Sequence, residues 1–267
     1  MQAEVYQNVG RVMGIPVSLA SKSEVVEAIA SRVSDGLTGG YISITNTESM
    51  YHALHRPDHL EYLENATFSL CDGVGVILAG LFWGLRIRRY NGPVLQLDCS
   101  CIGASRGWRH FFYGGKEGVA QRMADRLSAM YPGLLVVGTY CPPFRELTIE
   151  EDAEVVRIIN ESRPDFVWVG LGLIKQEKWI AQHLGRLNVP WLIGVGAAFD
   201  YHSGEVPWAP SFIRSIGCEW LFRLIIQPRL RARRYWWSLV FVVQACVFGV
   251  VNLAGAFRRG SRVTRQG

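Results

Sequence analysis

The sequence predicts an α/β fold, a mostly parallel β-sheet with flanking helices, followed by a basic and apolar helical tail. Two observations predict it. In residues 1–222, short apolar runs alternate with stretches of helical periodicity, and in residues 223–267 nine arginines and no acidic residue or lysine flank an uncharged segment. We therefore expect an α/β domain over 1–222 and an appendage over 223–267. The chain has 267 residues, 49% of them apolar, so it can form a core without a disulfide or metal.

The elements of the first part follow a strand–loop–helix order. Short apolar runs mark six candidate strands, at residues 41–44, 66–70, 109–113, 134–137, 166–169 and 191–193. Apolar residues at helical spacing mark candidate helices at 23–33, 57–64, 75–83, 117–130, 149–162 and 175–187. Start signals support two of these helices, Pro57 for one and Thr148 for another. Alternation of this kind is typical of a parallel sheet, whose ligands bind beyond the carboxyl ends of the strands.

The loops that follow these strands are rich in glycine. Glycines follow three different strands, at Gly114-Gly115, at Gly170 and Gly172, and at Gly194 and Gly196. Glycine lets the backbone approach a ligand closely, and the free N–H groups at the start of the next helix attract phosphate. Any α/β protein uses some glycines for tight turns, but three such loops together indicate a ligand that carries phosphate.

Asp72 is the carboxylate that we expect to act. It follows the strand at 66–70, which should lie beside the loop that starts at Thr45, and Gly73 and Gly75 leave space above it. An Asp-Gly pair after an apolar run is also typical of a plain turn or helix cap. A diphosphate nearby would raise the pKa of this carboxyl by like charge, which suits a general base for a sugar hydroxyl.

Common nucleotide and metal motifs are missing from the sequence. It has no GxGxxG after the first strand, no GxxxxGK[ST] and no DxD, which disfavours an NAD oxidoreductase and a P-loop NTPase. We expect neither metal nor cofactor, so arginines and backbone amides would neutralise a leaving diphosphate. His52, His55 and His59 are expected to be surface residues rather than metal ligands. The six cysteines include no CxxC, and we expect them to be reduced and mostly buried.

The tail predicts contact with a membrane. Residues 235–257 carry no charge, and as a helix they would extend about 34 Å, enough to cross a hydrocarbon core of about 30 Å. Three arrangements stay open: a buried core helix, monotopic insertion into the membrane or a hairpin within it, and a true span. Nine of the 28 basic residues lie in the tail, so residues 1–222 contain 19 basic and 23 acidic residues. The basic charge therefore belongs to the tail, and its apolar segment favours anionic lipid over nucleic acid as its partner.

Five ordered blocks of the sequence carry a resemblance to a known family. They are DGVGV at 72–76, FYGGK at 112–116, GLIKQEKW at 172–179, GVGAAFD at 194–200 and GCEWLFRL at 217–224. In order and spacing these blocks resemble the WecG/TagA/CpsF family of bacterial glycosyltransferases. The resemblance extends from about residue 15 to about residue 229.

The resemblance implies a Rossmann-like fold and an inverting, metal-independent transfer of a sugar from a UDP donor. The acceptor would be a polyprenyl-diphosphate-linked saccharide for a cell-envelope polysaccharide, at the cytoplasmic face of the bacterial cell membrane. Asp72 matches the proposed base, and Thr45, Arg89 and Gln176 match other catalytic positions. The further residues expected to contact substrates are Thr47, Asn91, Gly114, Gly115, Lys116, Gly172, Lys175, Glu177, Gly194, Gly196, Phe199, Asp200, Arg214, Arg223, Arg229 and Arg231. Whether the chain forms a homo-oligomer stays open.

The first block of the family departs from its pattern here. Thr47 stands at the family's asparagine position and Ser49 at its glutamate position. We expect both residues near the sugar or the acceptor, so the donor is defined only as a hexose or N-acetylhexosamine. Two other functions stay open. One is a nucleotide-sugar oxidoreductase or epimerase, which would bind NAD(P). The other is a non-catalytic membrane protein that binds lipid diphosphates and releases no UDP from any donor.

Overall fold

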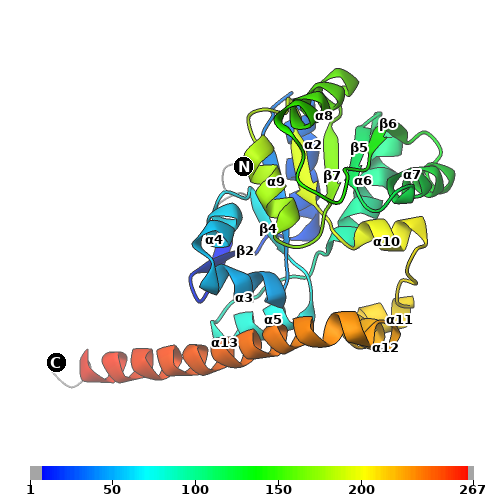
Figure 1. The fold of residues 1–267 in the computed structure, drawn as a ribbon. Coiled ribbons are helices and arrows are strands. Elements are labelled where there is room, and N and C mark those ends of the chain that lie inside the picture. The colour runs from blue at the N-terminus through cyan, green and yellow to red at the C-terminus, as the bar shows by residue number, and fades with distance from the viewer. Residues whose placement is uncertain (1–7, 264–267) are drawn as a thin grey trace.

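A six-stranded parallel sheet forms the centre of the molecule (Figure 1). The computed structural model describes residues 8–263, with the side chains of 8–229, 231–232 and 234–251. The strands lie in the order β4-β3-β8-β7-β5-β6. Their bounds are β3 (Gly40–Thr45), β4 (Phe68–Cys71), β5 (Arg109–Gly114), β6 (Leu135–Tyr140), β7 (Phe166–Gly170) and β8 (Trp191–Gly194). Each predicted strand overlaps one of these, so the predicted α/β fold is confirmed.

An antiparallel hairpin that the sequence analysis did not predict precedes the sheet. It pairs β1 (Val9–Val12) with β2 (Ile15–Ser18), and the turn between them contains Met13 and Gly14. Each strand has only four residues, which is too short for the alternation of apolar and polar residues to stand out.

The six predicted helices are present, with small changes at their ends. They are α2 (Lys22–Ser34), α4 (Pro57–Glu64), α5 (Val74–Phe82), α7 (Val119–Met130), α8 (Ile149–Ser162) and α9 (Lys175–His183). The start of α7 is later than predicted because Gly118 takes a left-handed conformation, with φ of 75°. The end of α9 is earlier than residue 187, and Gly185 follows it with φ of 82°.

Five further helices in the described residues were not predicted. They are α3 (Thr47–His55), α6 (Gly92–Arg106), α10 (Ala198–Ser203), α11 (Ser211–Ser215) and α12 (Glu219–Ile226). The sequence of α6 begins Gly-Pro and contains a second glycine, so its helical tendency is weak. The helix forms because Asn91 accepts a hydrogen bond from the Val94 N–H and because one face is buried. The predicted domain boundary after residue 222 falls inside α12.

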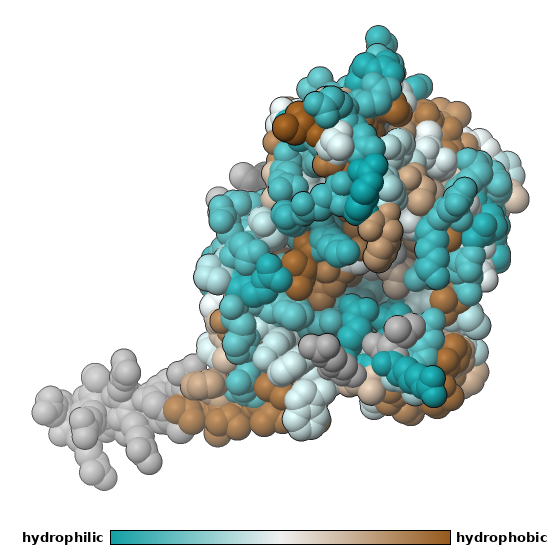
Figure 2. Space-filling model, in the orientation of Figure 1, coloured by the Kyte–Doolittle hydropathy of each residue, from teal (hydrophilic) through white to brown (hydrophobic). Residues whose placement is uncertain are grey.

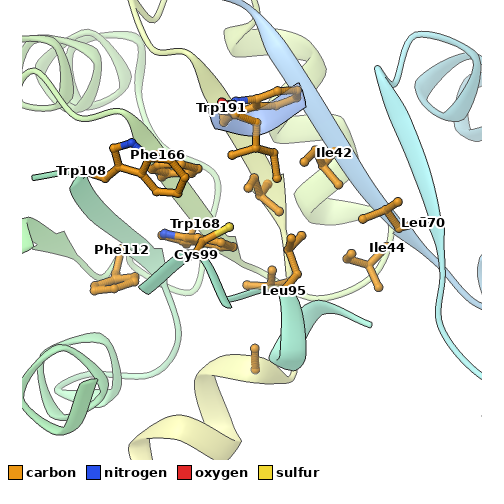
Figure 3. Close-up of a cluster of buried hydrophobic side chains, with 14 of the residues drawn as sticks. Ile42, Ile44, Leu70, Leu95, Cys99, Trp108, Phe112, Phe166, Trp168 and Trp191 are labelled. Atoms are coloured by element: carbon orange, nitrogen blue, oxygen red, sulfur yellow. Dashed lines mark hydrogen bonds between the residues drawn. The ribbon is translucent and has the colours of Figure 1, made fainter. Parts of the chain in front are cut away.

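Side chains of successive strand residues alternate between the two faces of the sheet. On one face, Phe166 and Trp168 join a core cluster with α2, α6 and α7 (Figure 3). On the other, Val167 and Val169 pack in a cluster with α8 and α9. Helices therefore cover both faces, which explains why the strands appear as continuous apolar runs in the sequence.

The C-terminal helix α13 (Pro228–Val263) packs against α3 and α5 and then extends past the body of the molecule (Figure 1). Phe241 and Ala245 are fully buried in a third core cluster, and the Trp83 indole donates to the Ala245 carbonyl at 3.0 Å. The Trp237 ring stacks on that of Tyr51. The opposite face of α13 is exposed, so one side of this helix belongs to the core and the other faces solvent.

Two sequence expectations need correction. His59 is not a surface residue, because its ring is fully buried and its Nε2 lies 2.9 Å from the Ser49 hydroxyl. Burial lowers the pKa of His59 to about 4. The cysteines are free, as expected, but they are not mostly buried: only Cys71 and Cys99 are, whereas Cys101 and Cys141 are exposed.

Some of the predicted tail residues lie outside the described part of the chain. They are the side chains of Arg233, Arg258, Arg259 and Arg262 and the whole of Arg265.

Replacing Phe241 by alanine tests the packing of α13. We expect Phe241→Ala to lower the free energy of unfolding by about 3 kcal/mol, because it leaves a cavity between α13 and the α3–α5 pair. Urea denaturation followed by circular dichroism measures the change. Phe248→Ala, on a half-exposed ring of the same helix, is the matched control, with an expected change under about 0.5 kcal/mol. Equal changes in unfolding free energy for the two substitutions would contradict the packing of Phe241 against α3 and α5.

Candidate active site

A cavity of about 2270 Å³ lies at the carboxyl edge of the sheet. The loops that follow β3, β4, β5, β6, β7 and β8 all contribute to its lining, while α12 and α13 form the wall that faces them. This is the edge at which parallel sheets bind ligands. The C-terminal helices therefore complete a cavity that the sheet alone would leave open on one side.

The Asp72 carboxyl lies in this cavity, directly after β4. Its backbone N–H donates to the Thr45 carbonyl at 2.9 Å, which holds the loop beside the end of β3. Gly73 follows with φ of 105°, a conformation that suits only glycine and that turns the chain into α5. The Asp72 side chain is 23% exposed. Burial raises its pKa, Arg223 and Arg89 oppose that rise, and the Glu219 charge adds to it.

The Arg89 guanidinium connects Asp72 to the C-terminal helices. The backbone around Arg89 pairs with Cys71 at the end of β4, which brings the side chain to the same edge of the sheet. Its Nη2 lies 3.7 Å from Asp72 Oδ1 and 2.8 Å from Glu219 Oε2, and its Nη1 donates to the Arg214 carbonyl at 3.1 Å. Glu219 also accepts from Arg223 at 2.9 Å. Two carboxylates and two guanidinium groups thus alternate in one cluster.

Glycine turns and cations lie across the cavity from this cluster. Gly115 and Gly172 both have positive φ, near 80°, and the neighbouring Lys116 and Lys175 also line the cavity. Lys116 and Arg231 lower the pKa of Asp200, but burial outweighs them and raises it overall. Backbone amides beside cationic side chains suit an anion such as a diphosphate. Among residues 8–263, no three His, Cys, Asp or Glu side chains are grouped so that they could hold a metal ion.

Glu177 holds Gln176 and the start of α9 in place. Its Oε1 accepts from Gln176 Nε2 at 3.0 Å and its Oε2 from the Ile174 N–H at 2.6 Å. Ile174 has φ of 73°, a strained conformation for a branched residue, and the bond from its N–H helps to hold it. Glu177 is fully buried, and burial raises its pKa to about 7. Its position fits a supporting role for Gln176, which itself lines the cavity.

The structure brings most of the predicted site residues together. Those that line the cavity are Asp72, Arg89, Gln176, Thr47, Gly115, Lys116, Gly172, Lys175, Gly196, Phe199, Asp200, Arg223 and Arg231. Those outside the lining are Thr45, Asn91, Gly114, Glu177, Gly194, Arg214 and Arg229.

Four of the predicted site residues that do not line the cavity contact other parts of the protein or face solvent. The Thr45 hydroxyl is fully buried and lies 2.6 Å from that of Ser69. Asn91 caps α6, and the Arg214 guanidinium lies over the Trp208 ring at 3.8 Å. The Arg229 residue is exposed.

Sequence reasoning missed several residues of the C-terminal wall. Glu219 and Trp220 line the cavity, as do Arg234 and Tyr235. Arg234 pairs with Glu48 at 2.7 Å, which ties α13 to the start of α3. The GCEWLFRL block contains Glu219, but a glutamate four positions before an arginine is usually a solvated ion pair on a helix surface, so no functional role was predicted for it. Of the two positions that depart from the family pattern, Thr47 lines the cavity, whereas Ser49 is buried against His59.

The chain is similar in sequence to known glycosyltransferases. The sequence model of the glycosyl transferase WecG/TagA/CpsF family matches residues 10–252. Three similar proteins share one name, N-acetylglucosaminyldiphosphoundecaprenol N-acetyl-beta-D-mannosaminyltransferase. The protein of Bacillus subtilis is 28% identical over 229 residues, 85% of each chain. That of Bacillus spizizenii is 30% identical over 191 residues, 71% of this chain and 72% of its own. That of Staphylococcus aureus is 26% identical over 230 residues, 85% of this chain and 89% of its own.

The buried Glu177 carboxyl predicts a pH dependence of stability. The folded protein keeps a proton on Glu177 up to about pH 7, whereas the unfolded chain releases it near pH 4.5. The folded state therefore binds more protons between these values, and the contribution of Glu177 to stability falls as pH rises through this window. Relative to wild type, Glu177→Gln should gain about 3 kcal/mol in unfolding free energy from pH 4.5 to 7.

Urea denaturation at several pH values measures the difference in unfolding free energy between wild type and Glu177→Gln. Glu161→Gln, at an exposed position on α8, is the matched control. A gap between wild type and Glu177→Gln that stays constant with pH would show that Glu177 is already ionised in the folded protein.

Proposed function

Because the chain belongs to the WecG/TagA/CpsF family of glycosyltransferases, we propose that it transfers a hexose or N-acetylhexosamine from a UDP-sugar to a polyprenyl-diphosphate-linked saccharide. The names of its relatives, which contain an undecaprenyl diphosphate bearing N-acetylglucosamine, support this class of acceptor. The observation that carries the proposal is the carboxylate of Asp72 in the cavity, within reach of Arg89 and Arg223. Family membership favours transfer over the oxidoreductase and the non-catalytic alternatives.

The proposed reaction uses Asp72 as the general base. Its carboxylate takes the proton from a hydroxyl of the acceptor saccharide, and that oxygen forms a bond to the anomeric carbon of the donor. The bond from this carbon to the diphosphate oxygen breaks on the opposite side, so the configuration inverts and the electron pair leaves on UDP. Arg89 and Arg223, with the amides near Gly115 and Gly172, would stabilise the developing charge.

The raised pKa of Asp72 supports this role. A general base works best when its proton affinity is high enough to accept a proton yet low enough to remain ionised at the working pH. Burial raises the pKa of Asp72, which favours acceptance of a proton, and the two arginines oppose the rise. Gln176, with its amide held by Glu177, would orient the donor sugar.

A broad apolar surface supports contact with a lipid bilayer. Large apolar side chains are exposed on α5, α11, α12 and α13, which pack in series, and we call this surface the apolar platform. Figure 2 shows parts of it along the lower edge of the molecule, over α13 on the left and over α11 and α12 on the right. Its residues are Val74, Leu78, Leu81, Phe212, Ile216, Trp220, Leu221, Ile225, Ile226, Trp236, Leu239, Val243, Val247, Phe248, Val250 and Val251. Neighbouring helices that all expose large apolar side chains are typical of an interface with a membrane or a protein. The basic tail favours the anionic membrane surface, at its cytoplasmic face.

The geometry of α13 favours a peripheral or monotopic attachment. Within the described residues, one helix window, Arg234–Val251, is long and apolar enough to cross a membrane, and 17% of it is buried. However, Phe241 and Ala245 hold one side of this window in the protein core. On the other side, exposed residues recur every three or four positions from Trp236 to Val250. We therefore propose that α13 lies in the interface with this side toward the lipid.

The cavity and the apolar platform meet beside the proposed base. Val74, Trp220 and Leu239 belong to both, since each lines the cavity and is exposed to solvent. An acceptor whose diphosphate lies by the arginines could therefore keep its polyprenyl chain against these apolar side chains and in the bilayer. We propose that the acceptor enters from the platform and the UDP-sugar from the opposite, solvent-exposed end of the cavity.

Replacing Asp72 by asparagine tests the catalytic proposal. We expect Asp72→Asn to lower turnover by about a thousandfold, because the base is lost, while UDP binds at least as tightly since a negative charge is removed. A UDP-release assay measures turnover across UDP-glucose, UDP-N-acetylglucosamine and UDP-N-acetylmannosamine with a polyprenyl-diphosphate saccharide, and calorimetry measures UDP binding. Asp125→Asn, at an exposed position on α7, is the matched control. Turnover near wild type in Asp72→Asn would exclude Asp72 as the base.

Charges on the apolar platform test the membrane proposal. Removing α13 would open the core at Phe241, so substitutions on its exposed side are the sharper test. We expect Val243→Glu combined with Val247→Glu to weaken binding to phosphatidylglycerol vesicles by about tenfold or more, because two carboxylates would face an anionic surface. Vesicle flotation measures binding, and circular dichroism confirms the fold. Leu37→Glu, at an exposed position outside the platform, is the control. Unchanged flotation of the double variant would remove this surface as the membrane contact.

A further inference from the structure

Glu219 joins the two arginines that act on Asp72. Its Oε2 lies 2.8 Å from Arg89 Nη2, and its Oε1 lies 2.9 Å from Arg223 Nη2. The same Arg89 nitrogen is 3.7 Å from Asp72 Oδ1, so Glu219 has the shorter contact with it. The Glu219 side chain is only 7% exposed and lines the cavity. Both of its oxygens are therefore committed to cations that the proposed reaction needs.

The titratable groups that interact with Asp72 come from α12, α10, β4 and the loop after α5. Arg89 follows α5, and Glu219 and Arg223 belong to α12. Tyr201 of α10 and Cys71 of β4 are the other titratable groups that interact with Asp72. Burial raises the pKa of both, so they are neutral near pH 7. The charge that Asp72 experiences is thus set by two cations and by the one anion that holds them.

We infer that Glu219 is a positioning residue that draws the positive charge of Arg89 and Arg223 away from Asp72. This inference rests on the proposed function, in which Asp72 is the base and the arginines meet the leaving group. Without Glu219, both cations would act on Asp72 alone and weaken it as a base. The contributions to the pKa of Asp72 have the signs that this inference requires, because the Glu219 charge raises that pKa while Arg223 and Arg89 lower it.

A purely structural role for Glu219 makes a different prediction. If Glu219 served only to tether α12 to the body, its loss would let Arg89 and Arg223 drift. Binding of UDP would then weaken, and turnover would fall without a change in the pH dependence. If Glu219 draws the positive charge of Arg89 and Arg223 away from Asp72, its neutralisation adds one net positive charge to the cavity. UDP would then bind more tightly while turnover falls. The two roles therefore differ in the sign of the change in UDP affinity.

Glu219→Gln tests the inference because it removes the charge and keeps the size of the side chain. We expect the acidic limb of the kcat/KM profile to move down by about one pH unit. We also expect turnover to fall about tenfold as the base weakens, and UDP to bind about threefold or more tightly by calorimetry. Glu219→Asp, which keeps the charge, should restore the position of the acidic limb. Weaker UDP binding together with an unmoved limb in Glu219→Gln would overturn the inference.

The control and a second ligand separate this inference from the proposed function. Glu161→Gln, on the exposed side of α8, makes the same chemical change far from the charge cluster and should leave all three quantities as in wild type. If wild-type protein released no UDP from any donor, the proposed function would fail. Binding of inorganic diphosphate to wild type and Glu219→Gln would still decide the inference: tighter binding by the variant supports it, and weaker binding overturns it.

Discussion

The Arg89 guanidinium is the contact on which the arrangement of the site depends. It reaches Asp72 at the end of the edge strand β4, Glu219 on α12 and the backbone carbonyl of Arg214, so it joins parts of the chain more than 120 residues apart. A charged group that is this enclosed needs partners, because an unpaired charge in such surroundings costs several kcal/mol. The C-terminal helices supply these partners. The cavity is therefore complete only when α12 lies over the edge of the sheet.

Like α12, the helix α13 is packed into the body of the molecule and helps to enclose the cavity. Its Phe241 and Ala245 side chains fill a core cluster with α3 and α5, and Arg234 pairs with Glu48 beside the cavity. The outer side of the helix is apolar and exposed, which would be unfavourable in water unless it served an interface. Under the membrane proposal, one helix would hold the site closed and also face the lipid that carries the acceptor.

Rigid backbone features place the groups on the other side of the cavity. Gly115 and Gly172 take left-handed conformations in the lining of the cavity, and the strained Ile174 is held by a bond to buried Glu177. Strain of this kind costs of order 1–3 kcal/mol and persists only where the surroundings fix it. A diphosphate would therefore meet donors that are already in place, with little reorganisation when it binds.

The sequence by itself determined the sheet, the glycine loops, Asp72 and the apolar, basic tail, because these depend on local patterns. Strands buried on both faces are continuous apolar runs, and a glycine before a helix marks a turn wherever it occurs. Tertiary structure alone decided which side chains face one another. It turned Thr45 and Ser49 into the interior, placed Glu219 between Arg89 and Arg223, and buried one side of α13 while exposing the other. Such contacts join residues distant in the chain, so neither spacing nor composition along the sequence can specify them.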